Sequence, residues 1–341
     1  MRTSLPELEL YETILGRLGS RARVEVMDRV RYRGEELPLY GTVLGSSDPN
    51  VPTFGLVGGV HGLERIGSRV VLAWMHTLSE LLDWDDLVVQ ALECTRLVFA
   101  PIVNPWGLLL RKRSNVSGVD LMRNAPPHEQ GRGSLLVGGQ RISPRLPWYM
   151  GEVGAPMQPE ARALCDFIRK HVFPGRPSIV LDCHSGFGFK DRLWFPYART
   201  RRPFPHLAEV YALNRLFDAT LPNHVYRFEP QARNYTVRGD LWDYLHDQHQ
   251  DSEHRDATFL PLTLEMGSWR WVKKNPRQIL TALGGFNPVK PHRLRRTLRR
   301  HVQLFDFLYR ATASSRRWLS EDPEVRESRE AEAFRLWFSR S

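Results

Sequence analysis

The 341-residue sequence contains only three cysteines, Cys94, Cys165 and Cys183, and no CxxC pair. An odd number of widely spaced thiols argues against a disulfide framework and is typical of a reducing compartment. The N-terminal stretch lacks the continuous apolar core of a signal peptide. No apolar run approaches the ~20 residues that a membrane span needs. These absences predict a cytoplasmic protein without a membrane span.

Acidic residues are fewer than basic ones, 38 against 48, which gives a net charge of +10. A basic chain can bind nucleic acid, anionic membranes or acidic substrates. The sequence shows no zinc-finger spacing, no aromatic run of the RNA-binding type and no basic region followed by heptads. Nucleic acid is therefore not expected as a partner.

Short apolar runs alternate with amphipathic stretches along most of the chain. Apolar runs predict strands over 51–60, 95–105, 177–186 and 258–267, and helical periodicity predicts helices over 7–19, 65–82, 159–172, 204–221 and 290–312. Residues 22–45 alternate polar and apolar positions, which predicts a hairpin turning at an Arg-Gly pair. This order predicts an α/β fold with a mixed, mainly parallel twisted sheet and helices on both faces. We expect one catalytic domain over 1–315, hairpin included, and a charged tail over 316–341.

Ionisable side chains stand at the ends of three predicted strands. His61 and Glu64 follow the first buried strand, His184 ends the third and Glu265 the fourth. The carboxyl ends of parallel strands meet at one edge of a sheet, where α/β proteins bind ligands. Two imidazoles and one carboxylate form the ligand set of many catalytic zinc sites. Gly62 would let the chain turn tightly, so that His61 and Glu64 face one ion.

Four motifs in this order resemble the signatures of the zinc metallocarboxypeptidases, the carboxypeptidase A-like family, in its bacterial-type short-loop form. They are the His-x-x-Glu after a buried strand, "NPWGLLLRKRSNVSGVDLMRN", "LDCHSGFG" and "LTLEMGS". The resemblance extends over residues 51 to about 267, and it implies that one zinc ion per chain is held by His61, Glu64 and His184. It also implies that Glu265 is the general base and later proton donor, and that Arg113 polarises the scissile carbonyl.

The resemblance also implies how substrate is bound. Arg123 matches the residue that binds a terminal carboxylate, and Tyr244 loosely matches the mobile substrate tyrosine of the family. Asp120 would orient His61 from behind, as ligating histidines usually require. Met122 stands where the family usually has an asparagine that helps to bind the carboxylate. Because a thioether accepts hydrogen bonds only weakly, Met122 predicts weaker recognition of that group.

Three functions remain open from the sequence. The first is a carboxypeptidase that cleaves a peptide near a free carboxylate. The second is a zinc amidohydrolase acting on N-acyl amino acids or murein peptides, which Met122 favours. The third is a non-catalytic basic binding protein on this fold, and the intact set of ligands with Glu265 argues against it.

The residues between Tyr244 and Glu265 are expected to form the specificity pocket. This segment is rich in polar residues and contains His246, His249 and His254. We interpret these histidines as loop residues rather than as a second metal site.

Overall fold

A computed structural model describes residues 4–126, 134, 136–281 and 283–339. Its strands form one eight-stranded sheet in the order β1-β2-β4-β3-β5-β8-β6-β7. In chain order the strands are β1 (Ala22–Tyr32), β2 (Glu35–Gly45), β3 (Thr53–Gly58), β4 (Arg96–Ala100), β5 (Ser178–Ser185), β6 (Arg192–Phe195), β7 (Arg227–Pro230) and β8 (Phe259–Met266). The α-helices are α1 (Pro6–Leu18), α2 (Arg65–Leu81), α3 (Asp86–Glu93), α4 (Pro105–Leu110), α5 (Pro159–His171), α6 (Leu207–Thr220), α7 (Leu241–Gln250), α8 (Trp269–Lys274), α9 (Pro291–Ala313) and α10 (Pro323–Trp337).

The sheet is parallel at its centre, antiparallel where β2 joins β1 and β4 and where β6 joins β8, and parallel again between β6 and the edge strand β7. Strand β3 pairs in parallel with β4 and with β5, and β5 pairs in parallel with β8. Strands β1 and β2 form the predicted hairpin, which turns at Arg33 and Gly34 with φ values of 52° and 84°. Such positive φ values match the twist of a two-residue hairpin turn. The mixed, mainly parallel α/β fold is thereby confirmed, whereas β6, β7, α3 and α7 were not predicted.

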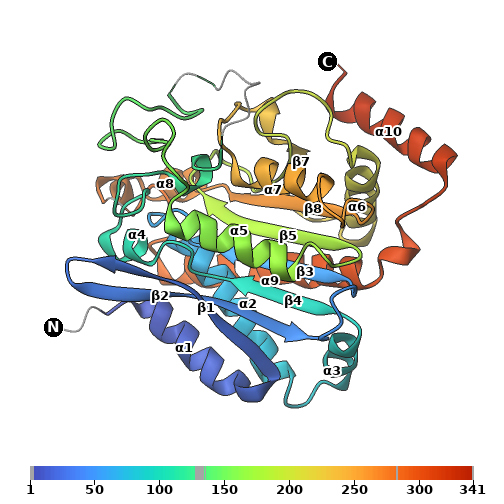
Figure 1. Cartoon of the computed structure of the whole chain (residues 1–341), viewed down its shortest axis with the longest axis horizontal. Helices are drawn as coiled ribbons and strands as arrows, with labels where there is room; N and C mark the ends of the chain where they lie inside the picture. The colour runs from blue at the N-terminus through green and yellow to red at the C-terminus, as the bar shows by residue number, and fades with distance from the viewer. Residues whose placement is uncertain (1–3, 127–133, 135, 282, 340–341) are drawn as a thin grey trace.

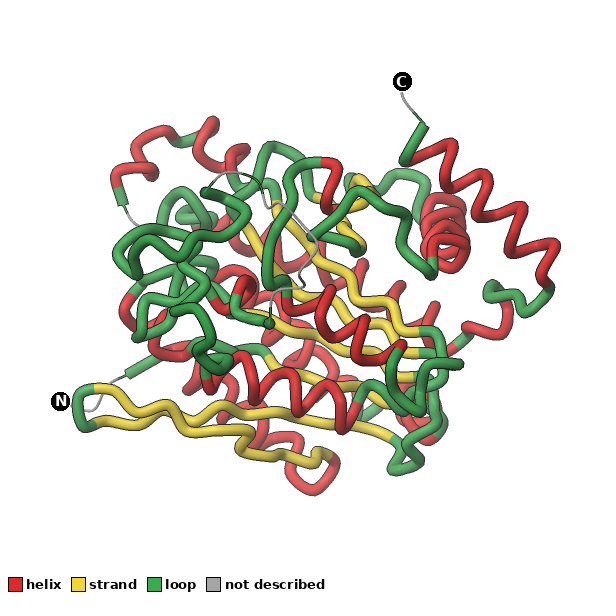
Figure 2. The backbone as a smooth tube through the Cα atoms, turned by 45° about the horizontal axis from the view of Figure 1, so that its top comes forward, coloured by secondary structure: helices red, strands yellow, loops and turns green. Residues whose placement is uncertain are grey.

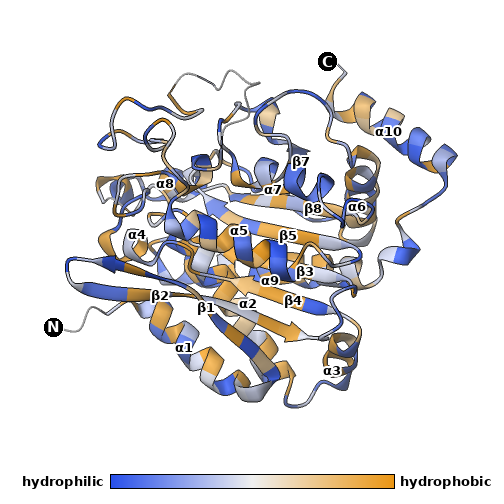
Figure 3. Ribbon diagram, viewed as in Figure 1, coloured by the Kyte–Doolittle hydropathy of each residue, from blue (hydrophilic) through white to orange (hydrophobic). Residues whose placement is uncertain are grey.

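Helices cover both faces of the sheet, as the periodicity predicted. Helices α2 and α9 pack on one face, with α1 against α2, and α5 and α7 pack on the other. In Figure 1, α5 lies in front of the central strands while α2 and α9 lie behind them, and Figure 2 shows the same layers from a second direction. Figure 3 shows hydrophobic residues gathered on the central strands between these layers. Among the described helices, none combines the length and the apolar character that a bilayer crossing requires.

Helix α2 shows how the sequence pattern becomes packing. Its residues Val70, Val71, Trp74, Met75 and Leu78 are all buried, at the spacing of one helix face. The indole of Trp74 donates a 2.7 Å hydrogen bond to Asp306 on α9, so that the one polar atom of this large side chain is satisfied. The same face therefore fixes α2 to the sheet and to α9.

The segment beyond residue 315 continues into helix α10, which packs against α6. Ala333 and Trp337 of α10 are buried in the core cluster that also contains the α6 side chains. The Trp337 indole donates a 3.0 Å hydrogen bond to the carbonyl oxygen of Phe228. The described part of the charged tail is therefore packed as part of the same body as the sheet.

The central strands carry the candidate site to one edge. In the parallel ladders, Gly58 at the end of β3 lies opposite Cys183, and His184 on β5 lies opposite Glu265 on β8. The turn after β3 packs tightly on α4, because a Cβ at Gly62 would lie 1.9 Å from the backbone carbon of Gly107. Gly62 is not among the glycines with positive φ, so it is required for this close approach rather than for a left-handed turn.

A Cβ at Gly62 should therefore disrupt the packing of the turn after β3 against α4. Gly62→Ala is expected to lower the free energy of unfolding by more than the ~3 kcal/mol at the upper end of ordinary overpacking, because backbone must move. Gly16→Ala is the matched control, since a Cβ at this exposed position on α1 meets no atom within 4 Å. It should raise stability by about 0.5–1 kcal/mol. Denaturant unfolding measures both, and equal stabilities would contradict the packing of α4 on this turn.

Candidate metal centre and active site

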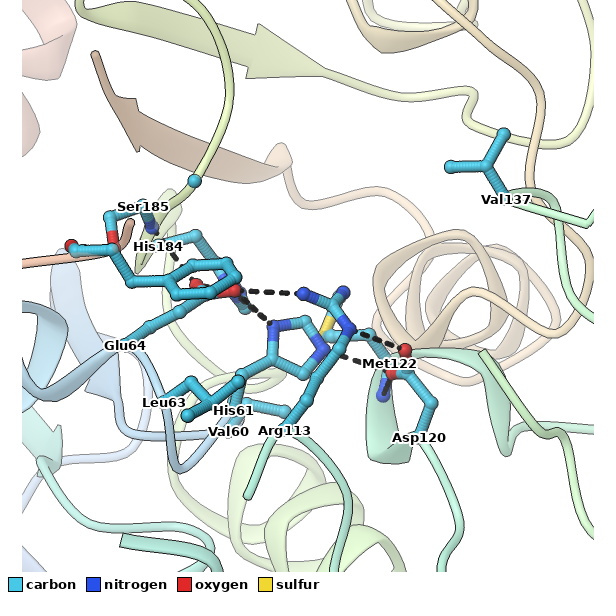
Figure 4. Close-up of polar contacts among 12 residues, drawn as sticks. Val60, His61, Leu63, Glu64, Arg113, Asp120, Met122, Val137, His184 and Ser185 are labelled. Carbon is cyan, nitrogen blue, oxygen red and sulfur yellow. Dashed lines mark hydrogen bonds and ion pairs between the residues drawn. The ribbon is translucent and has the colours of Figure 1, made fainter. Parts of the chain in front are cut away.

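Three side chains predicted as metal ligands converge at this edge of the sheet. His61 Nδ1 lies 3.0 Å from Glu64 Oε1, and His184 Nδ1 lies 3.1 Å from Glu64 Oε2. The two Nδ1 atoms are 3.2 Å apart, and one ligand atom from each residue lies within 4.8 Å of the others. All three side chains are buried, and Figure 4 shows them pointing toward one another. Such facing nitrogen and carboxylate oxygen atoms form a binding site for one cation.

The outer nitrogen of each histidine is held by a buried carboxylate. His61 Nε2 lies 2.9 Å from Asp120 Oδ1, and His184 Nε2 lies 2.7 Å from Asp182 Oδ2. These contacts favour the tautomer in which Nδ1 carries a lone pair toward the shared point, as zinc ligation requires. The donor set therefore fits zinc. Asp120 was predicted in this position, but Asp182 was not.

The charges around the ligands compensate one another. Burial alone would raise the pKa of Asp120, but Arg123, Arg113 and His61 together hold it well below its usual value. Arg113 Nε and Arg123 Nη1 donate to Asp120 Oδ2 at 2.9 and 3.0 Å. Burial likewise opposes ionisation of Glu64, and the two histidines hold its pKa well below its usual value. Both carboxylates are therefore ionised.

Glu265 differs from these carboxylates. It is 9% exposed, and its Oε2 atom has no hydrogen-bond partner among the described residues. Burial and the nearby Glu64 charge raise the pKa of Glu265 to about 8. A carboxylate with a free oxygen and a raised pKa can accept a proton near neutral pH.

A cavity of about 1020 Å³ opens in front of these groups. Glu64, Arg113, Arg123 and Glu265 line it, together with exposed Lys112 and Arg145 at its rim. Arg113 also donates a 2.9 Å hydrogen bond from Nη1 to Glu64 Oε1, so its Nη2 group remains without a partner among the described residues. Arg123 donates from Nε and Nη2 to the Val137 carbonyl at 3.0 and 2.8 Å, which fixes its guanidinium at the cavity wall.

Tyr244 lies outside this cavity, so the loose match to a substrate tyrosine is corrected. Its hydroxyl oxygen accepts a 2.8 Å hydrogen bond from Gln248 on the same helix, and its ring packs against the buried cluster beneath α7. Tyr235 is the tyrosine that lines the cavity. Burial and the Glu265 charge raise the pKa of Tyr235, so its hydroxyl stays protonated and can donate. Tyr235 was missed from the sequence, where no motif marks it as a residue of the site.

The specificity segment predicted between Tyr244 and Glu265 is also corrected. None of the described residues between these two positions lines the cavity. His246 and His249 are fully buried on α7 rather than in a loop, and burial lowers the pKa of both. The cavity is walled instead by the turns at 112–118 and 144–148, by 185–187 and by Phe286. The first two turns lie between α4 and α5, in a part of the chain of which 127–133 and 135 lie outside the described residues.

Met122 does not present its side chain to substrate. It is 6% exposed, belongs to the buried cluster under α5 and α7, and is not among the residues that line the cavity. It lies in the 3-10 turn Leu121–Arg123, from which Arg123 alone reaches the cavity. The thioether therefore contributes to packing rather than to recognition.

The carboxylate behind His184 should determine metal affinity. We expect Asp182→Asn to weaken zinc binding about 10–100-fold, the usual effect of losing such a partner, and His184→Ala to abolish it. Asp306→Asn is the matched control, since both aspartates accept a hydrogen bond from a tryptophan indole, Trp242 and Trp74 respectively. Competition with a chromogenic chelator measures the affinities. Undiminished zinc binding by His184→Ala would exclude this ligand set.

The comparisons with known proteins agree with this geometry. The model of the zinc carboxypeptidase family matches residues 33–279. Carboxypeptidase SOL1 of Arabidopsis thaliana is 35% identical over 240 residues, which are 65% of this chain and 41% of that protein. Carboxypeptidase E of Caenorhabditis elegans is 33% identical over 100 residues, 26% of this chain and 21% of that protein. The chain thus spans less than half the length of these curated relatives.

Solved structures show the same fold at low sequence identity. Thrombin activatable fibrinolysis inhibitor superposes with a TM-score of 0.67 and 17% identity, covering 90% of this chain and 74% of that one. Carboxypeptidase A from Helicoverpa armigera gives a TM-score of 0.65 and 15% identity, covering 89% and 71%. The family match covers most of the chain and includes all four motifs on which the resemblance depended. The chain belongs to the zinc carboxypeptidase family.

Proposed function

We propose that this chain is a zinc-dependent peptidase that hydrolyses a peptide bond next to a free carboxylate, as a carboxypeptidase does. The observation that carries the proposal is the free, buried Oε2 of Glu265 on the strand beside the His61–Glu64–His184 set, at the wall of a large cavity. When bound, zinc would polarise the scissile carbonyl and lower the pKa of water. The chain's own groups would supply the remaining steps.

Glu265 acts as the general base in this proposal. It accepts a proton from the attacking water and delivers it to the nitrogen of the leaving amine. Arg113 donates to the oxyanion that develops on the carbonyl oxygen from its Nη2 group, which bonds to none of the described residues. Because its other two donor sites are fixed on Asp120 and Glu64, the guanidinium is oriented before substrate arrives.

Cationic groups at the cavity wall favour a substrate with a free carboxylate. Arg123 is held rigidly by Val137 and Asp120 and keeps two N–H groups that no described residue accepts. Lys112 and Arg145 add two exposed positive charges at the rim. Tyr235 contributes a hydroxyl donor on the same wall. The same features would accept the carboxylate of an N-acyl amino acid. Turnover of N-acyl amino acids is therefore measured together with turnover of peptides, to test the amidohydrolase alternative.

The first test isolates the base. Glu265→Gln should retain one zinc per chain and lose more than the ~10²–10⁴-fold usually attributed to general acid–base catalysis. Glu209→Gln replaces another buried glutamate, on α6, and should leave turnover unchanged. Zinc content and turnover of a free-acid peptide are measured on both proteins. Loss of zinc from Glu265→Gln would make Glu265 a ligand rather than the base.

The second test concerns the carboxylate. Arg123→Ala should remove a preference for free over amidated C-termini that amounts to about ten- to a hundredfold, because a hydrogen bond to a charged group contributes ~1.5–3 kcal/mol. Arg123→Lys should retain part of it, since the charge remains without the planar fork. Met122→Asn should leave the preference for free over amidated C-termini unchanged, because this side chain faces the core and not the cavity.

Zinc content and melting temperature control for the structural bonds of Arg123. If the preference survives in Arg123→Ala but is lost in Lys112→Ala or Arg145→Ala, the rim anchors the substrate instead. Turnover of N-acyl amino acids without turnover of peptides would favour the amidohydrolase.

A further inference from the structure

A second cavity lies between α8 and the N-terminal half of α9, with a volume of about 250 Å³. It shares none of its described lining residues with the active-site cavity. Five cations and one carboxylate line it: Arg270, Lys274, Arg293, Arg296, Arg300 and Asp191. The cavity is therefore strongly positive, and its positive groups come from two helices that face each other.

Three of these cations are held in place by the protein. Arg270 Nη2 and Arg300 Nη1 donate to the two oxygens of Asp191 at 2.8 and 2.7 Å. Arg293 donates at 3.2 Å to each of two backbone carbonyls at the end of α8, those of Trp271 and Lys274. These contacts fix the guanidinium groups without neutralising them all, because Asp191 can balance only one of its two arginines and the carbonyls carry no net charge.

The other two cations are Lys274 and Arg296. No hydrogen bond or ion pair joins the side chain of Lys274 or of Arg296 to another described residue, and both are exposed. Like charges that line one cavity repel one another, and water screens them only partly inside a concave site. A multiply charged anion would relieve this repulsion. Guanidinium and ammonium groups around a hollow are the groups with which proteins bind phosphate.

We propose that the α8–α9 cavity binds a phosphate group. The fixed arginines form its floor, and the flexible side chains of Lys274 and Arg296 close on the anion from the solvent side. The phosphate belongs either to a soluble phosphorylated molecule or to a lipid headgroup, since both present the same oxygens. A concave site of this size holds a phosphate group rather than an extended polymer, and the site is independent of the proposed peptidase reaction.

Two binding experiments on the full chain test the proposal. Calorimetric titration with inorganic pyrophosphate at about 0.15 M salt, where the Debye length is ~8 Å, measures the soluble arm. Sedimentation with vesicles of phosphatidic acid in phosphatidylcholine, against phosphatidylcholine alone, measures the lipid arm. Saturable binding in either arm is the expected result, and the arm that binds identifies the source of the phosphate.

Charge reversal then locates the site. The double variant Lys274→Glu/Arg296→Glu should weaken binding at least tenfold. The control double variant Arg295→Glu/Arg299→Glu changes the net charge by the same amount at two exposed positions of α9 that do not line the cavity. It should bind the phosphate probe as tightly as the unmodified protein does. Unchanged zinc content and melting temperature establish that both variants are folded. Absence of binding in both arms, or equal loss in both variants, would overturn the proposal.

Discussion

The buried carboxylate of Asp120 holds together the parts of the site that come from different segments. Its two oxygens contact His61 Nε2, Arg113 Nε and Arg123 Nη1 at 2.9–3.0 Å, and Oδ1 also accepts from the backbone N–H of Met122. Removing one partner of a buried charge typically costs about 3–5 kcal/mol, because the other is left uncompensated. These ion pairs therefore hold the segment that carries Arg113 and Arg123 against His61. Orientation of the metal ligand and assembly of the substrate wall are consequences of the same charge pairing.

The second histidine is oriented by the same principle. His184 and Asp182 lie two residues apart on β5 and therefore project to the same face. Asp182 Oδ2 also accepts a 2.9 Å hydrogen bond from the Trp242 indole on α7. A helix that touches no substrate thereby fixes the direction of His184. The parallel strands set the positions of the metal ligands, and the carboxylates of Asp120 and Asp182 set the orientation of the two imidazole rings.

Strand ends and the four motifs were predictable because their signals are local. A buried apolar run that stops at His61, His184 or Glu265 defines a sheet edge without knowledge of the remaining chain. Asp182 could not be recognised in the same way, because it lies inside a buried strand rather than at its end, and its contacts with His184 and with Trp242, 60 positions away, leave no mark in the local pattern. Tyr244 was assigned by a loose match alone, and the structure places it on α7, after the capping aspartate Asp240, whereas Tyr235 precedes the helix and lines the cavity. The cavity walls depended on irregular turns, for which the sequence has no periodicity to read.

The distribution of charge explains how a buried Met122 is compatible with a site that favours anions. The 3-10 turn directs Leu121 and Met122 into the core and Arg123 toward the cavity, so in the proposed function one residue of the turn serves recognition while two serve packing. Recognition then combines a rigid guanidinium with two exposed charges, Lys112 and Arg145, which act through space and are screened by salt. Such a wall attracts a negative group strongly but orients it weakly, since only Arg123 has a fixed direction. In the proposed function, the scissile bond is therefore positioned mainly by Arg113 and the metal ligands, whose side chains are held by the contacts described above.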